Sequence, residues 1–302
     1  MPHEEVLLVT DTAQGHEISE IMLKAASEVG VHLTIIIMRP RKFPGEEPPA
    51  FVAEAMKKSH VVICATSMTM FYTKARIAAC EAGARLLSMA GATASTFASN
   101  AMFADFERQA KLGKIIAAHI SKSSKIHITT SMGTDLELNV EGRSGRVVTG
   151  LTRKRGDAQG VPDIEVYVAP IESASYGMLI VDASASPMGL VKTPIRMEIK
   201  RGMVQRIRGG HEAHRLITML RATRNRNSYR VGEFGIGLNP LARLRGSIIE
   251  DEAVLETAHI ALGENRPLGG RNRAPIHVDL VFKQPRIELD GKLIWKGTRC
   301  LI

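Results

Sequence analysis

Short apolar runs alternate with longer amphipathic stretches over the first 120 residues, and this alternation limits the possible folds most. Continuous apolar runs between helical patterns indicate strands that are buried on both faces. The pattern therefore predicts a βαβαβαβ order and a parallel, twisted, Rossmann-like α/β sheet. The strand-like runs are Val6–Val9, Leu33–Met38, Val61–Ala65 and Leu86–Ala90, and the helical stretches between them cover 18–29, 49–57 and 75–82.

The turn after the first strand-like run, Thr10–His16, has neither a Gly-x-Gly-x-x-Gly fingerprint nor a Walker lysine. We therefore expect no dinucleotide cofactor. Sheets of this kind bind ligands at the carboxyl ends of their strands. The loop around 67–76 offers Tyr72, Thr73 and Arg76 as candidate substrate-binding residues, although an ordinary solvated helix start accounts for them equally well.

The pattern changes beyond a helical stretch at 103–120, after which strand-like runs predominate. A chain of 302 residues exceeds the size at which a single core usually keeps growing. We predict two domains, an α/β domain at 1–122 and a mostly β, α+β domain at 123–302. The second-domain strands are expected at 125–131, 135–140, 164–169, 177–182 and 195–200.

Apolar and polar residues alternate over Ala274–Phe282, as in a half-buried strand. His277 and Asp279 then share one face, about 7 Å apart along the chain. His259 lies earlier, across a loop rich in glycine and proline that can turn the chain back. Two imidazoles and one carboxylate suit non-haem Fe(II), and equally Zn or Mn.

Further carboxylates stand upstream at Glu233 and at Glu250–Glu252. They could serve a second metal ion or act as general acids and bases. A His-x-Asp pair on a strand is, however, also common as a hydrogen-bonded pair in a core. Both interpretations remain open from the residues alone, and the closeness of His259 and Glu233 favours the metal site.

An ordered set of motifs in the second half is similar to a family that contains both the M29 (aminopeptidase T) metallopeptidases and the 2,5-dihydroxypyridine 5,6-dioxygenases. The resemblance implies that His259, His277 and Asp279 are metal ligands. It also implies catalytic carboxylates at Glu233, at Glu172 through a short Pro-x-Glu match, and at Glu252. The motifs that carry it are Glu233–Pro240, Glu250–Glu252, Thr257–Gly263, Gly269–Gly270 and Ile276–Leu280.

The two branches of this family differ a few residues beyond the first ligand histidine, where the aminopeptidases have a tyrosine. The segment Gly263–Gly269 contains no tyrosine. The resemblance therefore favours a mononuclear non-haem Fe(II) ring-cleaving dioxygenase, with O2 and a hydroxylated N-heterocycle of the 2,5-dihydroxypyridine type as substrates. The alternative is an M29-like aminopeptidase that uses Zn, Co or Mn. The family also implies a homo-oligomer.

The formal net charge is +9, and much of it lies in the Arg- and Lys-rich stretch 200–230. Clustered cations could neutralise nucleic-acid phosphates, so a non-catalytic basic binding protein is a further alternative. The stretch holds a single aromatic residue, Tyr229, and no recognised nucleic-acid motif. We expect a solvated basic face, or one that attracts an acidic small molecule, and no nucleic-acid partner.

The three cysteines are too few and too scattered for a disulfide framework or a Cys-x-x-Cys zinc site. The first residues lack the basic and apolar regions of a signal peptide, and no segment has the roughly 20 apolar residues of a membrane span. The sequence thus predicts a cytoplasmic protein with no membrane partner.

Overall fold

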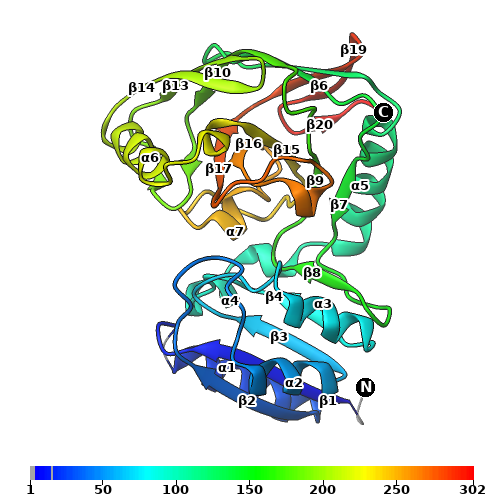
Figure 1. Cartoon of the computed structure of the whole chain (residues 1–302). Coiled ribbons are helices and arrows are strands. Elements are labelled where there is room, and N and C mark those ends of the chain that lie inside the picture. Colours follow the sequence, from blue (N-terminus) through cyan, green and yellow to red (C-terminus); the bar gives the residue numbers. More distant parts are fainter. Residues whose placement is uncertain (1–3, 15) are drawn as a thin grey trace. The chain divides into compact units, whose positions relative to one another are not determined.

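The computed structural model describes residues 4–14 and 16–302 (Figure 1). The chain divides into two compact units, Met1–Phe103 with Thr149–Pro162, and Ala104–Val148 with Asp163–Ile302. This division differs from the predicted boundary between residues 122 and 123. Helix α5 (Phe106–Ile120) belongs to the second unit because it packs against strands of that unit. The segment 149–162 returns to the first unit because it supplies a further strand to the sheet there.

The first unit contains the predicted parallel α/β sheet, in the strand order β2-β1-β3-β4-β8. Every strand pair in it is parallel. The sequence analysis did not predict the edge strand β8, because its sequence Ala-Gln-Gly has no strand pattern. The elements are β1 (Glu5–Asp11), α1 (Glu17–Val29), β2 (His32–Met38), α2 (Ala50–Lys58), β3 (Val61–Ala65), α3 (Lys74–Glu81), β4 (Arg85–Ser88), α4 (Ala94–Phe97), η1 (Asn100–Phe103) and β8 (Ala158–Gly160).

Helices cover both faces of this sheet, which explains its continuous apolar strands. One core cluster joins residues of α2 and α3 to one face of β1, β3 and β4, and another joins Ile18 of α1 and Phe97 of α4 to the opposite face. The carboxylate of Asp11, at the end of β1, accepts hydrogen bonds from the amide and the hydroxyl of Ser67, at 2.7 and 2.8 Å. The loops that follow β1 and β3 are therefore tied together.

The second unit is built from two antiparallel sheets. Their strand orders are β14-β13-β10-β6-β5-β18-β19-β20 and β12-β11-β17-β16-β15-β9-β7. The strands of the first are β5 (Lys125–Thr129), β6 (Asp135–Asn139), β10 (Ser175–Val181), β13 (Ile195–Lys200), β14 (Met203–Arg208), β18 (Arg286–Leu289), β19 (Lys292–Lys296) and β20 (Arg299–Cys300). Those of the second are β7 (Arg146–Val148), β9 (Glu165–Val168), β11 (Ser184–Ala185), β12 (Gly189–Leu190), β15 (Val231–Gly237), β16 (Thr257–Gly263) and β17 (His277–Lys283).

A single apolar core joins the two sheets of the second unit. Phe234, Phe282 and Trp295 are among its fully buried side chains. Helix α5 begins at the N-cap Asp105, whose carboxylate accepts a hydrogen bond from the amide of Arg108, and it packs on β7 and β9. The remaining helical segments are α6 (His211–Ala222), η2 (Arg226–Tyr229), α7 (Ile248–Asp251) and η3 (Arg266–Leu268). No helix in the described residues is long and apolar enough to cross a bilayer.

Candidate metal centre

Three neighbouring strands, β15, β16 and β17, present their apolar residues to the core and their polar residues to the opposite face. Successive side chains on a strand point to opposite sides of the sheet. Phe234, Ile260 and Leu280 are fully buried in the core. The residues at odd positions of the same strands, which include Glu233, His259, Ala261, His277 and Asp279, therefore share the other face.

Small residues on this face make room for the larger ligands. Gly235 lies directly opposite His259 in the strand register. A Cβ atom added to Gly235 would overlap the His259 imidazole, so the ring lies against a bare backbone. Ala261 lies between Glu233 on one side and Asp279 on the other. The alternation of small and ligating residues thus gathers the polar side chains without steric conflict.

The ligand atoms form two overlapping groups that share Glu233. In one group, His277 Nε2 lies 3.0 Å from a Glu233 oxygen and 3.2 Å from an Asp279 oxygen. In the other, His259 Nε2 lies 3.4 Å from Glu165 and 4.0 Å from the second oxygen of Glu233. Within each group the three ligand atoms lie within 4.8 Å of one another. The structure therefore brings together four of the predicted residues, and places the two histidines in different groups.

The backbone fixes the orientation of the His277 ring. Its Nδ1 lies 2.7 Å from the carbonyl oxygen of Glu264. Because a carbonyl only accepts hydrogen bonds, Nδ1 carries a proton and donates it. In the neutral ring Nε2 then keeps its lone pair, which faces Glu233 and Asp279. A hydrogen bond of this kind orients the metal-ligating histidines of many proteins.

Three buried polar atoms at this site have no hydrogen-bond partner in the described structure. They are Asp163 Oδ1, Glu165 Oε2 and His259 Nδ1. Leaving a buried polar atom unpaired is costly, so each such atom needs an explanation. A cation bound among the carboxylates would explain the unpaired oxygens and offset their mutual repulsion. The residues therefore fit a divalent metal ion with nitrogen and oxygen ligands.

The charges at the site shift the pKa values in a consistent way. Burial alone would raise the pKa of Glu233, but its hydrogen bonds to His259 and His277 and their charges outweigh burial and lower the pKa to about 2. Burial would lower the pKa of each histidine, and the surrounding carboxylates raise it instead. Without a metal, protons on the imidazoles thus balance part of the negative charge.

Asp163 and Glu165 belong to the site, although sequence reasoning missed them. Both are buried. Burial and the neighbouring carboxylates raise the pKa of Asp163 to about 7 and raise that of Glu165 well above its usual value. The signal that could have found them is the pattern Asp-x-Glu at the start of an apolar strand, since it repeats the spacing of His277 and Asp279.

Glu252 is at the C-cap of α7 and lies close enough to the site to share its electrostatics. Burial, together with the charges of Asp163, Asp279 and Glu233, raises its pKa well above the usual value. It is not a member of either ligand group. This position is compatible with the predicted role of an additional acidic residue, and that role stays a prediction.

Glu172 lies outside both ligand groups, in the loop after β9. One of its carboxylate oxygens is 2.6 Å from Arg143 Nη2, and the other accepts a hydrogen bond from the amide of Arg271 at 2.5 Å. These hydrogen bonds and the charge of Arg143 outweigh burial and lower the pKa of Glu172. The structure places Glu165, in contrast to the predicted Glu172, beside His259.

The candidate substrate-binding residues lie at the start of α3 in the first unit. The Thr73 hydroxyl donates to the carbonyl of Met70 and accepts from the amide of Arg76, as a helix N-cap. Arg76 donates to the carbonyl of Phe71 at 2.6 Å and lies over the Phe71 ring. The Tyr72 side chain is 42% exposed. These contacts show what holds Thr73 and Arg76 in place, and substrate binding by all three residues stays a prediction.

Comparisons with known proteins identify the family of this chain. A family model described as NicX, 2,5-dihydroxypyridine 5,6-dioxygenase, matches residues 1–301. A 2,5-dihydroxypyridine 5,6-dioxygenase of Pseudomonas putida KT2440 is 22% identical over 195 residues, which cover 60% of this chain and 56% of that protein. The match thus spans little more than half of that relative's length.

Two solved structures share the fold. A 2,5-dihydroxypyridine dioxygenase from Pseudomonas putida KT2440 has a TM-score of 0.82 and 16% identity, covering 99% of this chain and 92% of that one. Wild-type AmpT from Thermus thermophilus has a TM-score of 0.69 and 16% identity, with 99% and 94% covered. Because the family model spans nearly the whole sequence, the chain belongs to the NicX family, the family of 2,5-dihydroxypyridine 5,6-dioxygenases.

Proposed function

We propose that this protein is a ring-cleaving dioxygenase that uses one Fe(II) ion and acts on a hydroxylated N-heterocycle of the 2,5-dihydroxypyridine type. One observation carries the proposal. In a chain of the NicX family, two imidazoles and several carboxylates converge on one face of a buried sheet, with polar atoms left unpaired. Two histidines and one carboxylate are the ligands typical of non-haem Fe(II) oxygenases.

His259, His277 and Asp279 would hold the iron, which requires ligands from both groups; Glu233, which the groups share, lies between the two histidines. Bound Fe(II) would supply open coordination positions for an electron-rich ring and O2. Neither candidate group contains a cysteine. The oxygen and nitrogen donors agree with a site that binds a hard or borderline cation.

The protein's own groups would handle the protons of the substrate hydroxyls. A group with a pKa near neutrality both accepts and releases protons efficiently. Asp163, with a pKa of about 7 and an unpaired Oδ1, has this property. Glu165 and Glu252, whose pKa values are also raised, are further proton acceptors. Glu233, with its lowered pKa, would instead stay ionised and act as a fixed negative charge.

The surrounding sheet would restrict water. All seven residues of β15 and all seven of β16 are buried, whereas the side chains of His277 and Asp279 keep exposed fractions of 24% and 14%. Of these three strands, only β17 therefore leaves ligand side chains of the site partly exposed. Substrate would approach there, and its ring would be oriented against His277 and Asp279.

Replacement of His277 tests the proposal. His277→Ala removes one imidazole from the ligand set, so we expect loss of iron binding and of O2 uptake with 2,5-dihydroxypyridine. His127→Ala is a matched control, because His127 is on β5 in the other sheet and pairs with Asp135. A His277→Ala protein that keeps stoichiometric iron or undiminished O2 uptake would overturn the proposal.

A two-metal hydrolase of the aminopeptidase type is the second candidate. The observation that favours it is the shared Glu233, since a bridging carboxylate between two three-ligand groups suits two neighbouring cations. This candidate requires two Zn, Co or Mn ions per chain and release of the first residue from a leucyl peptide. One iron per chain and no peptide hydrolysis would exclude it.

A further inference from the structure

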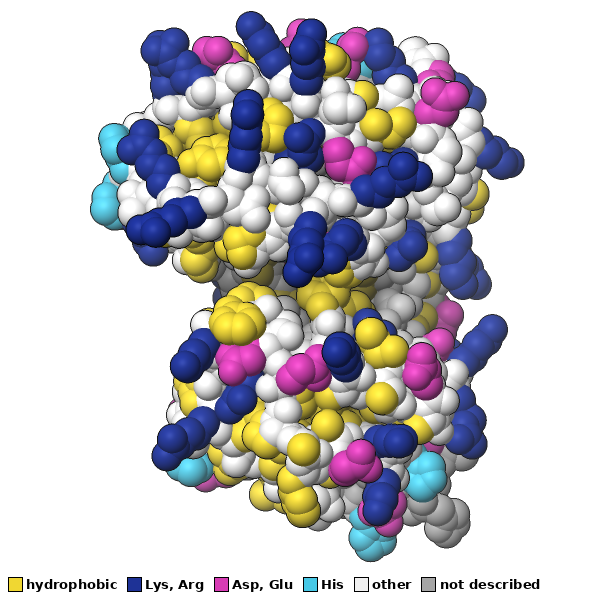
Figure 2. All heavy atoms as spheres, in the orientation of Figure 1, with side chains coloured by type: hydrophobic (Ala, Val, Ile, Leu, Met, Phe, Trp, Pro, Cys, Tyr) yellow, Lys and Arg dark blue, Asp and Glu magenta, His cyan; other side chains and the backbone are white. Residues whose placement is uncertain are grey.

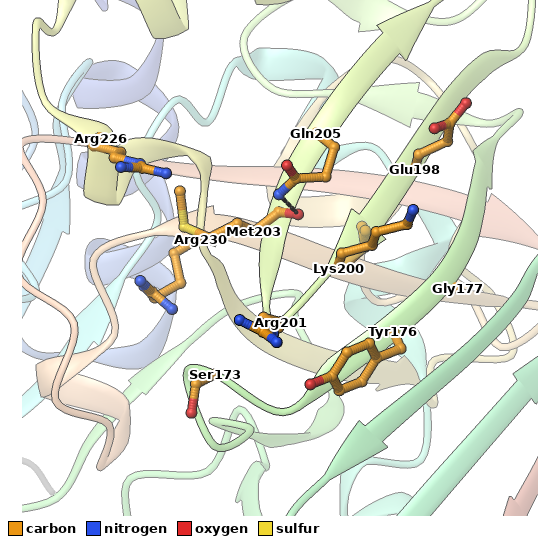
Figure 3. A pocket seen from close by; sticks show the side chains of 11 residues that line it. Ser173, Tyr176, Gly177, Glu198, Lys200, Arg201, Met203, Gln205, Arg226 and Arg230 are labelled. Atoms are coloured by element: carbon orange, nitrogen blue, oxygen red, sulfur yellow. Dashed lines mark hydrogen bonds between the residues drawn. The ribbon is translucent and has the colours of Figure 1, made fainter.

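A basic pocket lies on the outer face of the second unit, at the turn between β13 and β14. Its volume is about 820 Å³, and Figure 3 shows the side chains around it. The solvent faces of β10 and β13 and the segment around η2 form its walls. The residues that line it include Ser173, Tyr176, Lys200, Arg201, Arg226 and Arg230.

Cations predominate in the lining of this pocket. Lys200, Arg201, Arg226 and Arg230 contribute positive charge, and Glu198 is the single acidic residue of the lining. Within residues 4–14 and 16–302, the first three make no ion pair. Figure 2 shows Lys and Arg side chains spread over the drawn face of this unit. On that face the cations are spread out, whereas in the pocket several unpaired cations line the same cavity.

The backbone holds the centre of this basic group in a fixed position. Arg201 and Gly202 form the two-residue turn of the β13–β14 hairpin, with φ of 50° and 68°. A Cβ on Gly202 would overlap the carbonyl oxygen of Glu172, so the turn lies directly on that backbone. The Gly202 amide donates to the Ser175 carbonyl at 2.9 Å, and its carbonyl accepts from the Val231 amide at 2.9 Å.

Arg230 is held against the same backbone. Its Nη1 donates to the carbonyl of Glu172 at 2.5 Å. Because the turn and Arg230 contact one short segment, Arg201, Arg230 and Ser173 keep a fixed relation to one another. Prearranged donors lose little conformational entropy when they bind an anion, and an arginine fork matches the two oxygens of a carboxylate.

The pocket also has an apolar side. Tyr176 is 48% exposed, and Met203, elsewhere in the lining, is partly exposed. In Figure 3 the Tyr176 hydroxyl points toward the side of the pocket where Arg201 and Ser173 lie. A flat ring could lie on Tyr176 while its anionic group meets the arginines.

We propose that this pocket is a binding site for a small aromatic carboxylate, separate from the metal centre. The carboxylate would lie between Arg201 and Arg230, with the Tyr176 and Ser173 hydroxyls as additional donors. The ring would rest on Tyr176. A ligand with this combination of a flat apolar body and one anionic group uses both sides of the pocket, whereas a bare anion uses only one.

Calorimetric titration of the metal-loaded protein with benzoate tests this site, with benzamide and inorganic phosphate as comparison ligands. Arg201→Asn removes the central cation, and asparagine tolerates the left-handed backbone that this turn requires. We expect Arg201→Asn to weaken benzoate binding about tenfold or more, because a charge-assisted, bidentate contact is lost. Lys200→Gln should weaken it less.

Arg206→Gln is the matched control. Arg206 is on the same hairpin, in β14, and is not part of the pocket lining. This variant loses the same charge and should bind benzoate as the unchanged protein does. Equal loss in Arg201→Asn and Arg206→Gln would show a general charge effect and overturn the proposal.

Three further outcomes would also overturn it. Benzamide that binds as tightly as benzoate would show that the arginines do not recognise the carboxylate. Phosphate that binds as tightly as benzoate would show that the Tyr176 side contributes nothing. Unmeasurable benzoate binding to the unchanged protein, with its thermal unfolding intact, would mean that the pocket holds no such ligand.

Discussion

Glu165 and Glu172 lie close together in the sequence, at the start of β9 and in the loop after it, but their surroundings are opposite. Glu165 is buried beside His259, and its Oε2 has no hydrogen-bond partner in the described residues. Glu172 is held by Arg143, Asn265 and the amide of Arg271. The first carboxylate is available for a metal ion, and the second joins three loop segments.

Removing the charge of each residue should therefore have different effects. Glu165→Gln should lower metal affinity about tenfold or more, the range seen when groups around a metal are changed. Glu172→Gln should leave metal affinity nearly unchanged and reduce the free energy of unfolding by about 1–3 kcal/mol, because it breaks a partly buried ion pair. Metal titration and urea unfolding of both variants measure the two effects. The reverse result would mean that Glu172, and not Glu165, contributes to metal binding.

The site also depends on Gly235, which leaves bare backbone beside the His259 ring. Gly235→Ala would place a methyl group where the His259 ring lies, so we expect weaker metal binding. Gly232→Ala is the control on the same strand, since its Cβ would meet the Gly263 carbonyl at 2.9 Å and not a ligand. Both variants should lose stability, and only Gly235→Ala should lose metal affinity in a metal titration. Equal metal affinity in the two would contradict this account of Gly235.

Among the elements, periodicity predicted the alternation in the first unit and some of the strands in the second, but not β15 and β16, which carry Glu233 and His259. Strands β1 to β4 and helices α1 to α3 of the first unit follow the predicted alternation. The odd positions of β17 carry His277 and Asp279 as predicted. Strand β8 could not be predicted, because Ala-Gln-Gly has no period and pairs only through its backbone. Asp163 and Glu165 were missed because no local pattern shows which distant strand lies beside β15.

Helix α5 provides a prediction at this scale, through Gly113 in its interior. Glycine usually destabilises a helix by about 1 kcal/mol relative to alanine. Here a Cβ on Gly113 would lie 2.5 Å from a Val147 methyl and 3.2 Å from a Leu238 methyl. Overpacking costs about 1–3 kcal/mol, so Gly113→Ala should lower the free energy of unfolding despite the better helix propensity.

A double variant separates the two contributions. Val147→Ala removes the side chain that Gly113→Ala would strike, so the pair should be more stable than the sum of the single effects predicts. Urea unfolding of the two single variants and the pair gives the coupling energy. A stabilising Gly113→Ala variant would show that the helix does not approach β7 and β9 this closely.

For the whole molecule, the carboxylates and imidazoles of the candidate metal centre link stability to pH. The pKa values of His259, His277, Asp163, Glu165 and Glu252 are raised in the folded metal-free protein. The folded state then binds more protons than the unfolded state, and stability falls as pH rises. Glu233 acts in the opposite direction, because its pKa is lowered to about 2 from the usual 4.5, and its effect is confined to the pH range between these two values.

The metal-free protein should therefore lose free energy of unfolding as pH rises from the carboxylate range to above the imidazole value of 6.5. The contribution is complete below the unfolded pKa values and is lost as pH passes the folded ones. Metal ions replace these protons, so the metal-bound protein should show a flatter profile. Urea unfolding at several pH values, with and without metal, measures both curves. A metal-free protein that becomes more stable above pH 6.5 would contradict these pKa directions.

The homo-oligomer, the cytoplasmic location and the absence of a nucleic-acid partner stay predictions from the sequence. Family membership and the α/β fold with added antiparallel sheets are established by the comparisons and the structure. What links them to chemistry is the group of ligands on β15, β16 and β17. We predict that this group binds one catalytic iron ion.

The most direct measurement is the metal content of protein purified without oxygen, together with O2 uptake when 2,5-dihydroxypyridine is added. The account predicts about one iron per chain and uptake that follows the iron content, since a mononuclear site has one open set of positions. Two zinc, cobalt or manganese ions per chain, or iron-loaded protein that consumes no O2 with this substrate, would contradict it.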